Sequence, residues 1–278
     1  MRIAVLGLGI IGSVWARHLA SDGHQVRTWN RSAKPDVPGF SANPASAVRD
    51  AELILIVVAD SPAVAAVLAA AVPGLTKNAI VAQHSTIGVD DTKAAARTVQ
   101  AAGARYLDMP FTGSKPAAEQ RQNVFFVGDD VGALTEVEAI YRKLAKAILP
   151  MGGIGQAAAV KLAFNLLIAG INQSMCESFE LASRAGIDPQ VYFNALDFNV
   201  AKSSLADLKK PKYLSGDWSP QFSIKHMHKD LRLALALGRE HGLGLATTTA
   251  VTHAYATAEA AGRGDEDFAA LLEIVRQG

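Results

Sequence analysis

The sequence predicts an α/β fold in which a doubly wound sheet is followed by an all-helical domain. Short apolar runs that read as strands alternate with helical patterns as far as residue 149, the order typical of a sheet with helices on both faces. Beyond Gly155 the chain reads as helix or loop. A length of 278 residues also suits two domains. We expect the first to span residues 1–155 and the second residues 156–278.

The first strand, residues 2–6, runs directly into a turn with glycines at fixed spacing: Gly7-Leu8-Gly9-Ile10-Ile11-Gly12. A helical pattern then continues over residues 10–20. In this context the first glycine permits a tight turn, the second lets bare backbone approach a phosphate, and the third lets the helix pack on the strand. Since the N–H groups of a helix N-terminus attract anions, the motif predicts a Rossmann domain that binds a dinucleotide.

The end of the second strand distinguishes NAD from NADP. A site for NAD usually has Asp or Glu about 20 residues after the glycines, where it accepts hydrogen bonds from the ribose. Residues 25–29 form this strand, and Asn30, Arg31 and Ser32 follow it without an acid. A guanidinium and two polar groups suit a 2′-phosphate, so we expect NADP. The alternative is that Arg31 is a solvated loop cation.

The remaining pattern of the first domain continues the alternation. Residues 53–58 are an unbroken apolar run, typical of a central parallel strand buried on both faces. The elements expected after it are helix 62–71, strand 79–83, helix 89–102, strand 105–108, strand 123–127, helix 131–144 and strand 147–149.

The second domain begins with one long helix, residues 156–185, which we expect to link the domains. Gly186 stops it, and Asp188-Pro189 starts the next helix. Further helices are expected at residues 225–240, 246–261 and 265–276. Because long apolar helices often pack against a second subunit, we expect a homodimer or homotetramer.

Composition excludes several classes of function. Half of the residues are hydrophobic and the net charge is +1, which gives no electrostatic case for binding nucleic acid. The longest apolar run that reads as a strand, residues 53–59, is far short of the ~20 residues that span a bilayer. The first strand leaves no room for a signal peptide. Cys176 is the only cysteine, so we expect no disulfide within the chain and a cytoplasmic location.

Candidate substrate-binding residues follow the strand at 105–108, because ligands of doubly wound sheets bind beyond the carboxyl ends of strands. Thr112 and Ser114 offer hydroxyls and Gly113 offers a backbone N–H. This set suits a substrate carboxylate. An ordinary polar turn has the same composition.

Lys161 and Asn165 lie four residues apart near the start of the long helix, so their side chains share a face. The apolar neighbours of Lys161 disfavour a charged amine, and such a lysine can donate a proton near neutral pH. The alternative is a surface lysine with its stem on the helix. His226 and His228 have the spacing of metal ligands but no evident third ligand, so we expect no metal.

Four ordered motifs resemble those of the β-hydroxyacid dehydrogenase family over essentially the full chain. The first is the glycine turn with Asn30-Arg31-Ser32, and the second is Asp108-Met-Pro-Phe-Thr112-Gly113-Ser114, similar to the substrate loop D-x-P-V-S-G-G/S. The others are Gly152 to Asn165, similar to G-x-x-G-x-G-x-x-x-K-x-x-x-N, and Lys229-Asp230-Leu-Arg-Leu-Ala234, similar to K-D-L-x-L-A. The resemblance implies that Lys161 is catalytic and that Lys229 lies at the nicotinamide end of the cofactor.

Details resemble the branch of glyoxylate and succinic semialdehyde reductases. That likeness implies that Phe222 walls the substrate pocket, that Asp230 binds substrate beside Lys229, and that Ser85 and Thr86 contact the cofactor. Three departures from the family pattern stand out. Phe111 and Thr112 replace a usual valine and serine, Ala157 replaces a glycine, and Gln83-His84 replaces an acidic and an apolar residue.

The sequence therefore predicts an NADPH-dependent reductase of a small aldehyde acid, of the glyoxylate or succinic semialdehyde type. Lys161 would donate the proton, Asn165 would orient the carbonyl oxygen, and the 112–114 loop would hold the carboxylate. Three alternatives remain: a 3-hydroxyisobutyrate or tartronate semialdehyde type of dehydrogenase, an imine reductase, and a module that binds NADP without turnover.

Overall fold

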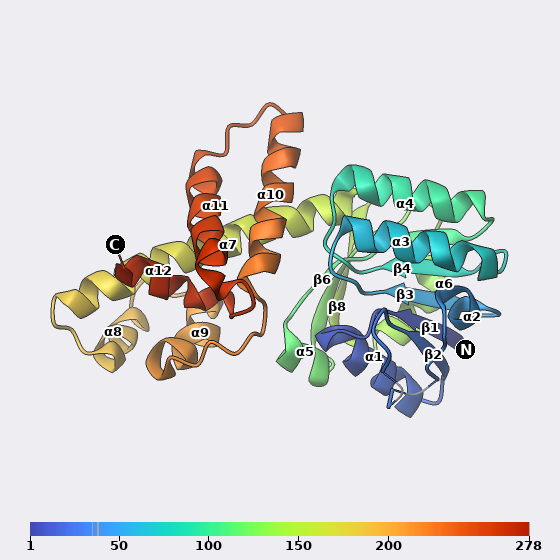
Figure 1. Cartoon of the computed structure of the whole chain (residues 1–278), viewed down its shortest axis with the longest axis horizontal. Coiled ribbons are helices and arrows are strands. Elements are labelled where there is room, and N and C mark those ends of the chain that lie inside the picture. Colours follow the sequence, from blue (N-terminus) through green and yellow to red (C-terminus); the bar gives the residue numbers. More distant parts are fainter. Residues whose placement is uncertain (35, 38, 278) are drawn as a thin grey trace. The chain divides into compact units, whose positions relative to one another are not determined.

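The computed structural model describes residues 1–34, 36–37 and 39–277. It divides the chain into two compact units, Met1–Lys161 and Leu162–Gly278 (Figure 1). The division falls within one long helix, α7 (Gln156–Arg184). The first unit is built on a sheet and the second is helical, which confirms the predicted fold class.

The sheet of the first unit has the strand order β2-β1-β3-β4-β5-β7-β6, with β8 paired to β7. Neighbours in the β2-β1-β3-β4-β5 segment are parallel. The order reverses at β1, which lies between β2 and β3, so a topological switch point lies at the carboxyl end of β1. The strands are β1 (Arg2–Leu6), β2 (Gln25–Trp29), β3 (Leu53–Ile56), β4 (Ile80–Gln83), β5 (Arg105–Asp108), β6 (Phe111–Thr112), β7 (Asn123–Gly128) and β8 (Ala145–Gly152).

Helices cover both faces of this sheet (Figure 1). Trp15 and Leu19 of α1 and Tyr141 of α6 belong to the apolar cluster on one face. Val67 of α3 and Val99 of α4 belong to the cluster on the other. The helices and helical turns are α1 (Ile10–Ser21), α2 (Pro44–Val48), α3 (Ser61–Ala71), η1 (Val72–Gly74), α4 (Val89–Ala101), α5 (Lys115–Glu119) and α6 (Leu134–Tyr141).

The sheet differs from the expected alternation at β7. This strand runs antiparallel to β5 and to β6. The connection from β5 holds only the two-residue β6 and the five-residue α5, whereas a parallel pair needs a longer crossover, usually a helix. The chain therefore folds back along the sheet edge after the candidate substrate loop.

Two predicted elements at the end of the first unit had wrong boundaries. The helix expected at 131–144 begins only at Leu134, because the Asp129 carboxylate accepts the N–H groups of Val131 and Leu134 in a turn. The strand expected at 147–149 is the longer β8, which pairs in parallel with β7. Pro150 hid its length, although an edge strand tolerates proline.

The second unit packs its helices around one apolar core. It contains the rest of α7, then α8 (Pro189–Leu196), α9 (Ser204–Ser215), α10 (Ile224–Glu240), α11 (Ala246–Ala258), η2 (Glu259–Arg263), η3 (Phe268–Leu271) and α12 (Leu272–Gln277). The side chain of Asp188 accepts the N–H groups of Gln190 and Val191 and so caps α8, as its place before a proline indicates.

Two of the last predicted helices have other boundaries in the structure, one at its end and one at its start. Helix α11 stops at Ala258 rather than 261, and the chain turns through Gly262 at a φ of +83°. The helix expected from residue 265 begins at Phe268, because the buried Asp267 carboxylate accepts the N–H of Ala269 as a cap. The same carboxylate pairs with the buried Lys209 at 2.7 Å.

Helix α7 is long and apolar enough, by length and composition alone, to cross a membrane. Its Ala169, Cys176 and Phe179 are nevertheless part of the apolar core of the second unit. Asn165 and Asn172 on the same helix are buried with polar partners. These contacts are typical of the core helix of a folded domain.

Candidate active site

The glycine turn packs tightly against neighbouring backbone at Gly7 and Gly12 and has free space beside Gly9. Gly7 has a φ of +107°, and a Cβ there would lie 2.2 Å from the Val57 carbonyl oxygen. A Cβ on Gly12 would lie 2.0 Å from the Gly7 oxygen, whereas one on Gly9 would meet nothing within 4 Å. Gly7 and Gly12 are therefore required by packing, and the backbone at Gly9 is accessible to a ligand.

The start of α1 suits an anion. Gly9 is the N-cap and provides no side-chain cap, and the first turn has no acidic residue. The unpaired N–H groups of a helix N-terminus carry partial positive charge. Because Leu8 is fully buried and the exposed residue at the centre of the turn, Gly9, has no side chain, the turn offers its backbone there. These features fit a dinucleotide pyrophosphate.

The loop after β2 is tied to this turn by Asn30. Its Oδ1 accepts the N–H of Leu8 at 2.9 Å, and its Nδ2 donates to the Ser32 carbonyl at 2.8 Å. The Asn30 amide thus holds the loop against the glycine turn, and its contact with the cofactor stays a prediction. Arg31 and Ser32 are exposed.

Sequence reasoning missed Lys34, whose Nζ donates to the Leu8 carbonyl at 2.6 Å. This bond brings a cation of the loop to the glycine turn. The signal was a lysine three residues after Arg31, but the sequence alone does not indicate which way its side chain points.

The residues after β4 have structural partners. The Ser85 hydroxyl is buried and accepts the N–H of Val58 at 2.8 Å, which joins the ends of β3 and β4. Thr86 follows and is half-buried. Both lie at the carboxyl edge of the sheet, where cofactors of this fold bind.

His84 explains one of the departures from the family pattern. Its Nδ1 lies 2.7 Å from the Met109 carbonyl oxygen and its Nε2 2.9 Å from the Tyr141 hydroxyl. Complete burial lowers the pKa of the imidazole to about 3. A neutral His84 therefore links the ends of β4 and β5 to α6, and it does not act as a catalytic base.

The candidate substrate loop follows β5 and includes β6. Gly113 has a φ of +102°, and a Cβ there would lie 2.8 Å from the Ala117 Cβ. Thr112, Gly113 and Ser114 are all half-buried. Ser114 is the N-cap of α5, but its hydroxyl makes no capping bond. The loop conformation thus requires glycine at its centre and leaves polar groups at its surface.

The start of α7 is capped by Asp108, a motif residue to which the sequence gave no role. One carboxylate oxygen accepts the N–H groups of Gly155 at 2.9 Å and Ala158 at 3.0 Å. Burial raises the pKa of this carboxyl to about 6, although the N–H groups of Ala158, Gly155 and Ala157 act in the opposite direction. Asp108 thereby joins the end of β5 to the turn of helix that precedes Lys161.

Lys161 is half-buried on α7, and Ala158 and Leu162 beside it are buried. Asn165, one turn further along the same helix, is 2% exposed. Its Nδ2 donates to the Asp230 carboxylate at 2.5 Å. The amide keeps a second N–H and its carbonyl oxygen for other partners.

Asp230 lies beside Lys229, as the resemblance implied. It is 1% exposed, and its two oxygens lie beside Asn165 and the Lys229 ammonium, the latter at 2.9 Å. A buried carboxylate would also repel an acidic substrate. These contacts suit the orientation of Asn165 and Lys229, and contact of Asp230 with the substrate stays a prediction.

Phe222 lies on a segment that the buried Asp267 fixes. The Asp267 carboxylate accepts the N–H of Gln221 at 2.9 Å and of Phe222 at 3.4 Å. The Phe222 ring lies 6.3 Å from that of Phe268. Its half-buried position is thus set by an ion pair that the sequence did not reveal, because the two members are 58 residues apart.

The two histidines of α10 have separate partners. His226 lies 2.6 Å from the Ser223 hydroxyl, and His228 lies 2.6 Å from the Glu259 carboxylate. Within the part of the chain that the structure describes, no group of three His, Cys, Asp or Glu side chains could hold a metal ion.

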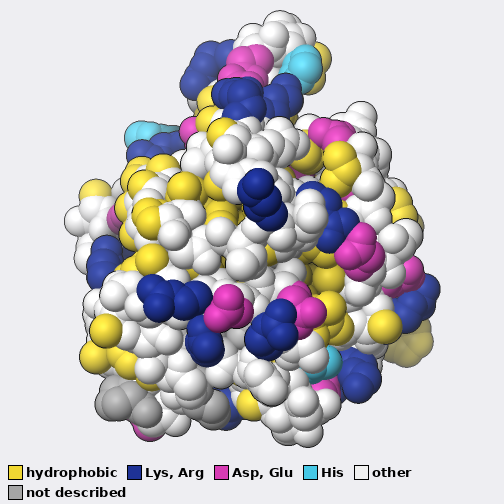
Figure 2. All heavy atoms as spheres, turned by 90° about the vertical axis from the view of Figure 1, so that its right-hand side faces the viewer, with side chains coloured by type: hydrophobic (Ala, Val, Ile, Leu, Met, Phe, Trp, Pro, Cys, Tyr) yellow, Lys and Arg dark blue, Asp and Glu magenta, His cyan; other side chains and the backbone are white. Residues whose placement is uncertain are grey.

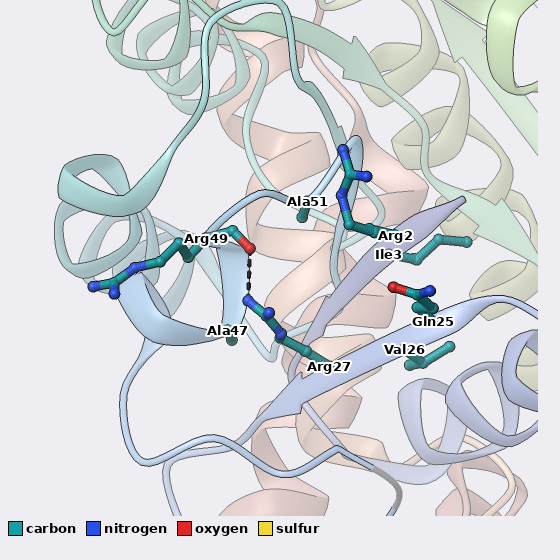
Figure 3. Close-up of a pocket in the computed structure, with 8 residues that line it drawn as sticks. All are labelled: Arg2, Ile3, Gln25, Val26, Arg27, Ala47, Arg49 and Ala51. Atoms are coloured by element: carbon teal, nitrogen blue, oxygen red, sulfur yellow. Dashed lines mark hydrogen bonds between the residues drawn. The ribbon is translucent and has the colours of Figure 1, made fainter.

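A cavity of about 220 Å³ lies elsewhere in the first unit. Arg2 and Gln25, the first residues of β1 and β2, line it, and so do Arg27 and Arg49 (Figure 3). The Arg27 guanidinium donates to the Arg49 carbonyl at 2.7 Å. Because it lies at the amino ends of the strands, this cavity is at the edge opposite the glycine turn.

Charges of both signs are interspersed over the face of the molecule seen in Figure 2, with no single large basic area. This mixed distribution agrees with the net charge of +1. That face offers no electrostatic preference for a polyanion.

Two family models match the chain almost end to end. Residues 2–153 match the NAD binding domain of 6-phosphogluconate dehydrogenase. Residues 155–275 match the domain described as NAD-binding of NADP-dependent 3-hydroxyisobutyrate dehydrogenase.

Known proteins are similar over the same length. The glyoxylate/succinic semialdehyde reductase 1 of Arabidopsis thaliana is 26% identical, with 99% of each chain covered. The 2-hydroxy-3-oxopropionate reductase of Escherichia coli is 30% identical, with 99% of this chain and 97% of that one covered. The structure of 3-hydroxyisobutyrate dehydrogenase from Mycobacterium tuberculosis has a TM-score of 0.88 at 24% identity, covering 99% of each chain.

The fold and the glycine turn, together with these matches, define an NAD(P)-dependent oxidoreductase that acts on CH–OH groups. More particularly, the chain belongs to the β-hydroxyacid dehydrogenase family. This finding confirms the resemblance that its motifs indicated.

Proposed function

We propose that the protein reduces a small aldehyde acid, of the glyoxylate or succinic semialdehyde type, to the hydroxyacid with NADPH. The observation that carries the proposal is the pair Lys161 and Asn165, one helical turn apart on α7, with the Asn165 amide oriented by Asp230. A half-buried lysine beside a fixed amide suits the protonation of a carbonyl oxygen.

The residues proposed to hold the cofactor are those of the first unit at the carboxyl edge of the sheet, with Lys229 of α10 at the nicotinamide end. The backbone of residues 7–12 would bind the pyrophosphate, and Arg31, Ser32 and Lys34 would bind the 2′-phosphate. Ser85 and Thr86, which follow β4, would also contact the cofactor. When bound, the reduced nicotinamide supplies the hydride that forms the new C–H bond.

The proton comes from the chain. The Lys161 ammonium donates it to the carbonyl oxygen, which becomes the hydroxyl of the product, and the neutral amine regains a proton from water. The free N–H of Asn165 donates to the same oxygen and stabilises its developing charge. Thr112, Gly113 and Ser114 hold the carboxylate through hydroxyl and backbone N–H groups.

The NADP preference is tested by comparing Arg31→Ala, Lys34→Ala and the double variant with wild type. Loss of charge-assisted bonds to the 2′-phosphate should raise the KM for NADPH by about tenfold or more. In Arg31→Ala the KM for NADH should stay nearly unchanged, whereas Lys34→Ala also loses the bond to the Leu8 carbonyl in the glycine turn. If the ratio of the two KM values stays at its original value, these cations do not read the 2′-phosphate.

A second candidate substrate is tartronate semialdehyde, since the relative at 30% identity is named for 2-hydroxy-3-oxopropionate. Following NADPH absorbance with glyoxylate, succinic semialdehyde, tartronate semialdehyde, methylmalonate semialdehyde and a cyclic imine separates the alternatives. We expect the highest kcat/KM with an aldehyde acid. Turnover of the imine alone would indicate an imine reductase, and tight NADPH binding without any turnover would indicate a binding module.

We also propose that the protein is a homodimer or homotetramer in the cytoplasm. Large apolar side chains of the second unit are exposed: Leu181 is 73% exposed, Phe198 94% and Val200 103%. Exposed apolar groups of this size are typical of surfaces that a partner subunit covers. The cytoplasm is proposed because Cys176, the only cysteine, is a free thiol.

A further inference from the structure

Asn123, the first residue of β7, is a fully buried polar side chain beside the candidate substrate loop. Its Oδ1 accepts the indole N–H of Trp15 at 3.0 Å. Its Nδ2 donates to the carbonyl oxygens of Gly113 at 3.0 Å and Thr112 at 3.4 Å. One amide therefore bonds both to α1 and to the loop.

The chemistry of the partners fixes the orientation of this amide. An indole N–H can only donate and the two loop carbonyls can only accept. Only an amide offers one acceptor and two donors in this arrangement. An aspartate would set a carboxylate oxygen against two carbonyl oxygens, and a leucine would leave buried polar groups without partners, which is costly.

The loop conformation also depends on this contact. Gly113 adopts a positive φ, and a Cβ there would lie 2.9 Å from the Nδ2 of Asn123. The backbone at Gly113 therefore packs directly on the amide, and the position of the Thr112 and Ser114 side chains follows from it.

Trp15 is equally constrained. It is fully buried on α1, the helix that opens from the glycine turn. Its ring contacts those of His84, Phe111 and Phe125 at centroid distances of 5.0, 4.9 and 5.2 Å. Phe111 and His84, two of the departures from the family pattern, thus pack on the indole that holds Asn123.

We propose that Asn123 is a positioning residue for the substrate loop, residues 112–114, and that Trp15 holds Asn123 from the cofactor-binding helix. Affinity for the substrate carboxylate then depends on this pair. The inference rests on the proposed function of the loop as the carboxylate site.

The direct test compares Asn123→Asp and Asn123→Leu with wild type. We expect the KM for the preferred aldehyde acid to rise by about 10- to 100-fold, the equivalent of one or two lost hydrogen bonds. The kcat should change by less than about threefold, since the substitutions do not alter Lys161 or Asn165. The Kd for NADPH should change by less than about twofold, since they do not alter the glycine turn. The kcat/KM for an aldehyde without a carboxylate should stay near its wild-type value.

Trp15→Phe is the milder variant and decides the question if the Asn123 variants do not fold. It keeps one aromatic ring in the cluster and removes the indole N–H together with the volume of the second fused ring. We expect a smaller rise of KM in the same direction, and less than additive effects when it is combined with Asn123→Leu, because both changes break one network.

Asn172→Asp is the matched control. Asn172 is also fully buried, and its Nδ2 donates to the Tyr255 hydroxyl and the Phe268 carbonyl. This substitution should lower the melting temperature by about as much as the Asn123 substitutions do, but it should leave the KM for the aldehyde acid unchanged. An equal rise of KM in this control, or no rise in the Asn123 and Trp15 variants, overturns the inference.

The variants Thr112→Ala and Ser114→Ala distinguish a failure of the inference about Asn123 from a failure of the proposed function. If these variants raise the KM and the Asn123 variants do not, only the positioning role is wrong. If none of them changes the KM, the loop does not hold the carboxylate.

Discussion

At the scale of single residues, the first unit shows how burial decides which polar groups can react. His84 is neutral because it is enclosed by Trp15, Phe125 and Tyr141, and both of its nitrogens have partners. Asp108 and Asp230 are also buried, but N–H groups or an ammonium face their carboxylates. These groups hold others in place, and Lys161 is left as the candidate proton donor.

Residue identity predicted the glycine turn, because only glycine fits at Gly7 and Gly12. It did not reveal the roles of Asn123, Lys34 or Asp267. A buried asparagine or lysine in a sequence has no periodicity of its own, and its partners lie far away along the chain. Asn123 and Trp15, for example, are 108 residues apart.

Gln83 provides a prediction about stability. It is 1% exposed at the end of β4, and neither atom of its amide has a hydrogen-bond partner among the described residues. A buried polar group without a partner costs about 1–3 kcal/mol. Gln83→Leu, with a similar volume, should therefore raise the free energy of unfolding by about 1 kcal/mol in urea melts. Destabilisation by a similar amount would show that the amide is bonded in solution.

At the scale of elements, α7 is the element on which the proposed chemistry depends. Its start is fixed by Asp108 at the end of β5, and the substrate loop leaves from the same strand. The sequence predicted this helix to within one residue of its end, because 29 residues of apolar spacing are a strong signal. It missed the antiparallel direction of β7, which follows from the short connection after β5, and the extent of β8, whose pattern Pro150 interrupts.

Asp108 makes stability depend on pH. Its pKa is raised to about 6 from 3.8, so the folded state favours the protonated acid. The stability that this group contributes is present below pH 3.8 and is lost as the pH rises through 6. A shift of this size corresponds to roughly 2–3 kcal/mol.

The measurement compares the free energy of unfolding of wild type and Asp108→Asn between pH 5 and 7.5. The asparagine oxygen can still accept the N–H groups of Gly155 and Ala158, but it does not titrate. We expect the free energy of unfolding of the variant, relative to that of wild type, to rise by about 1–2 kcal/mol between pH 5 and pH 7.5. A constant difference between the two proteins would mean that Asp108 does not titrate there.

At the scale of the whole molecule, the residues proposed to act in the reaction come from both units. The first carries the glycine turn, the substrate loop and Lys161, and the second carries Asn165, Lys229 and Asp230. The order of strands and helices along the chain predicted this two-part architecture. The sequence did not predict which apolar residues of the second unit are exposed, because helical spacing alone does not distinguish a core face from a subunit interface.

The oligomer is tested by Phe198→Asp combined with Val200→Asp. Both side chains are almost fully exposed, so the changes should not destabilise an isolated chain by more than about 0.5 kcal/mol. If this surface forms the subunit interface, two buried charges should shift the molar mass in light scattering to that of a single chain. An unchanged mass would place the interface elsewhere.

The central claim is that the ammonium of Lys161 donates the proton during carbonyl reduction, and Lys161→Ala with Lys161→Arg tests it most directly. Measured with the preferred aldehyde acid, kcat should fall by about 10²- to 10⁴-fold in both variants, since arginine stays protonated. The Kd for NADPH should stay within about twofold of wild type, because only an interaction of the transition state is removed. Retention of most of the wild-type kcat in either variant, with NADPH still bound, would contradict the account.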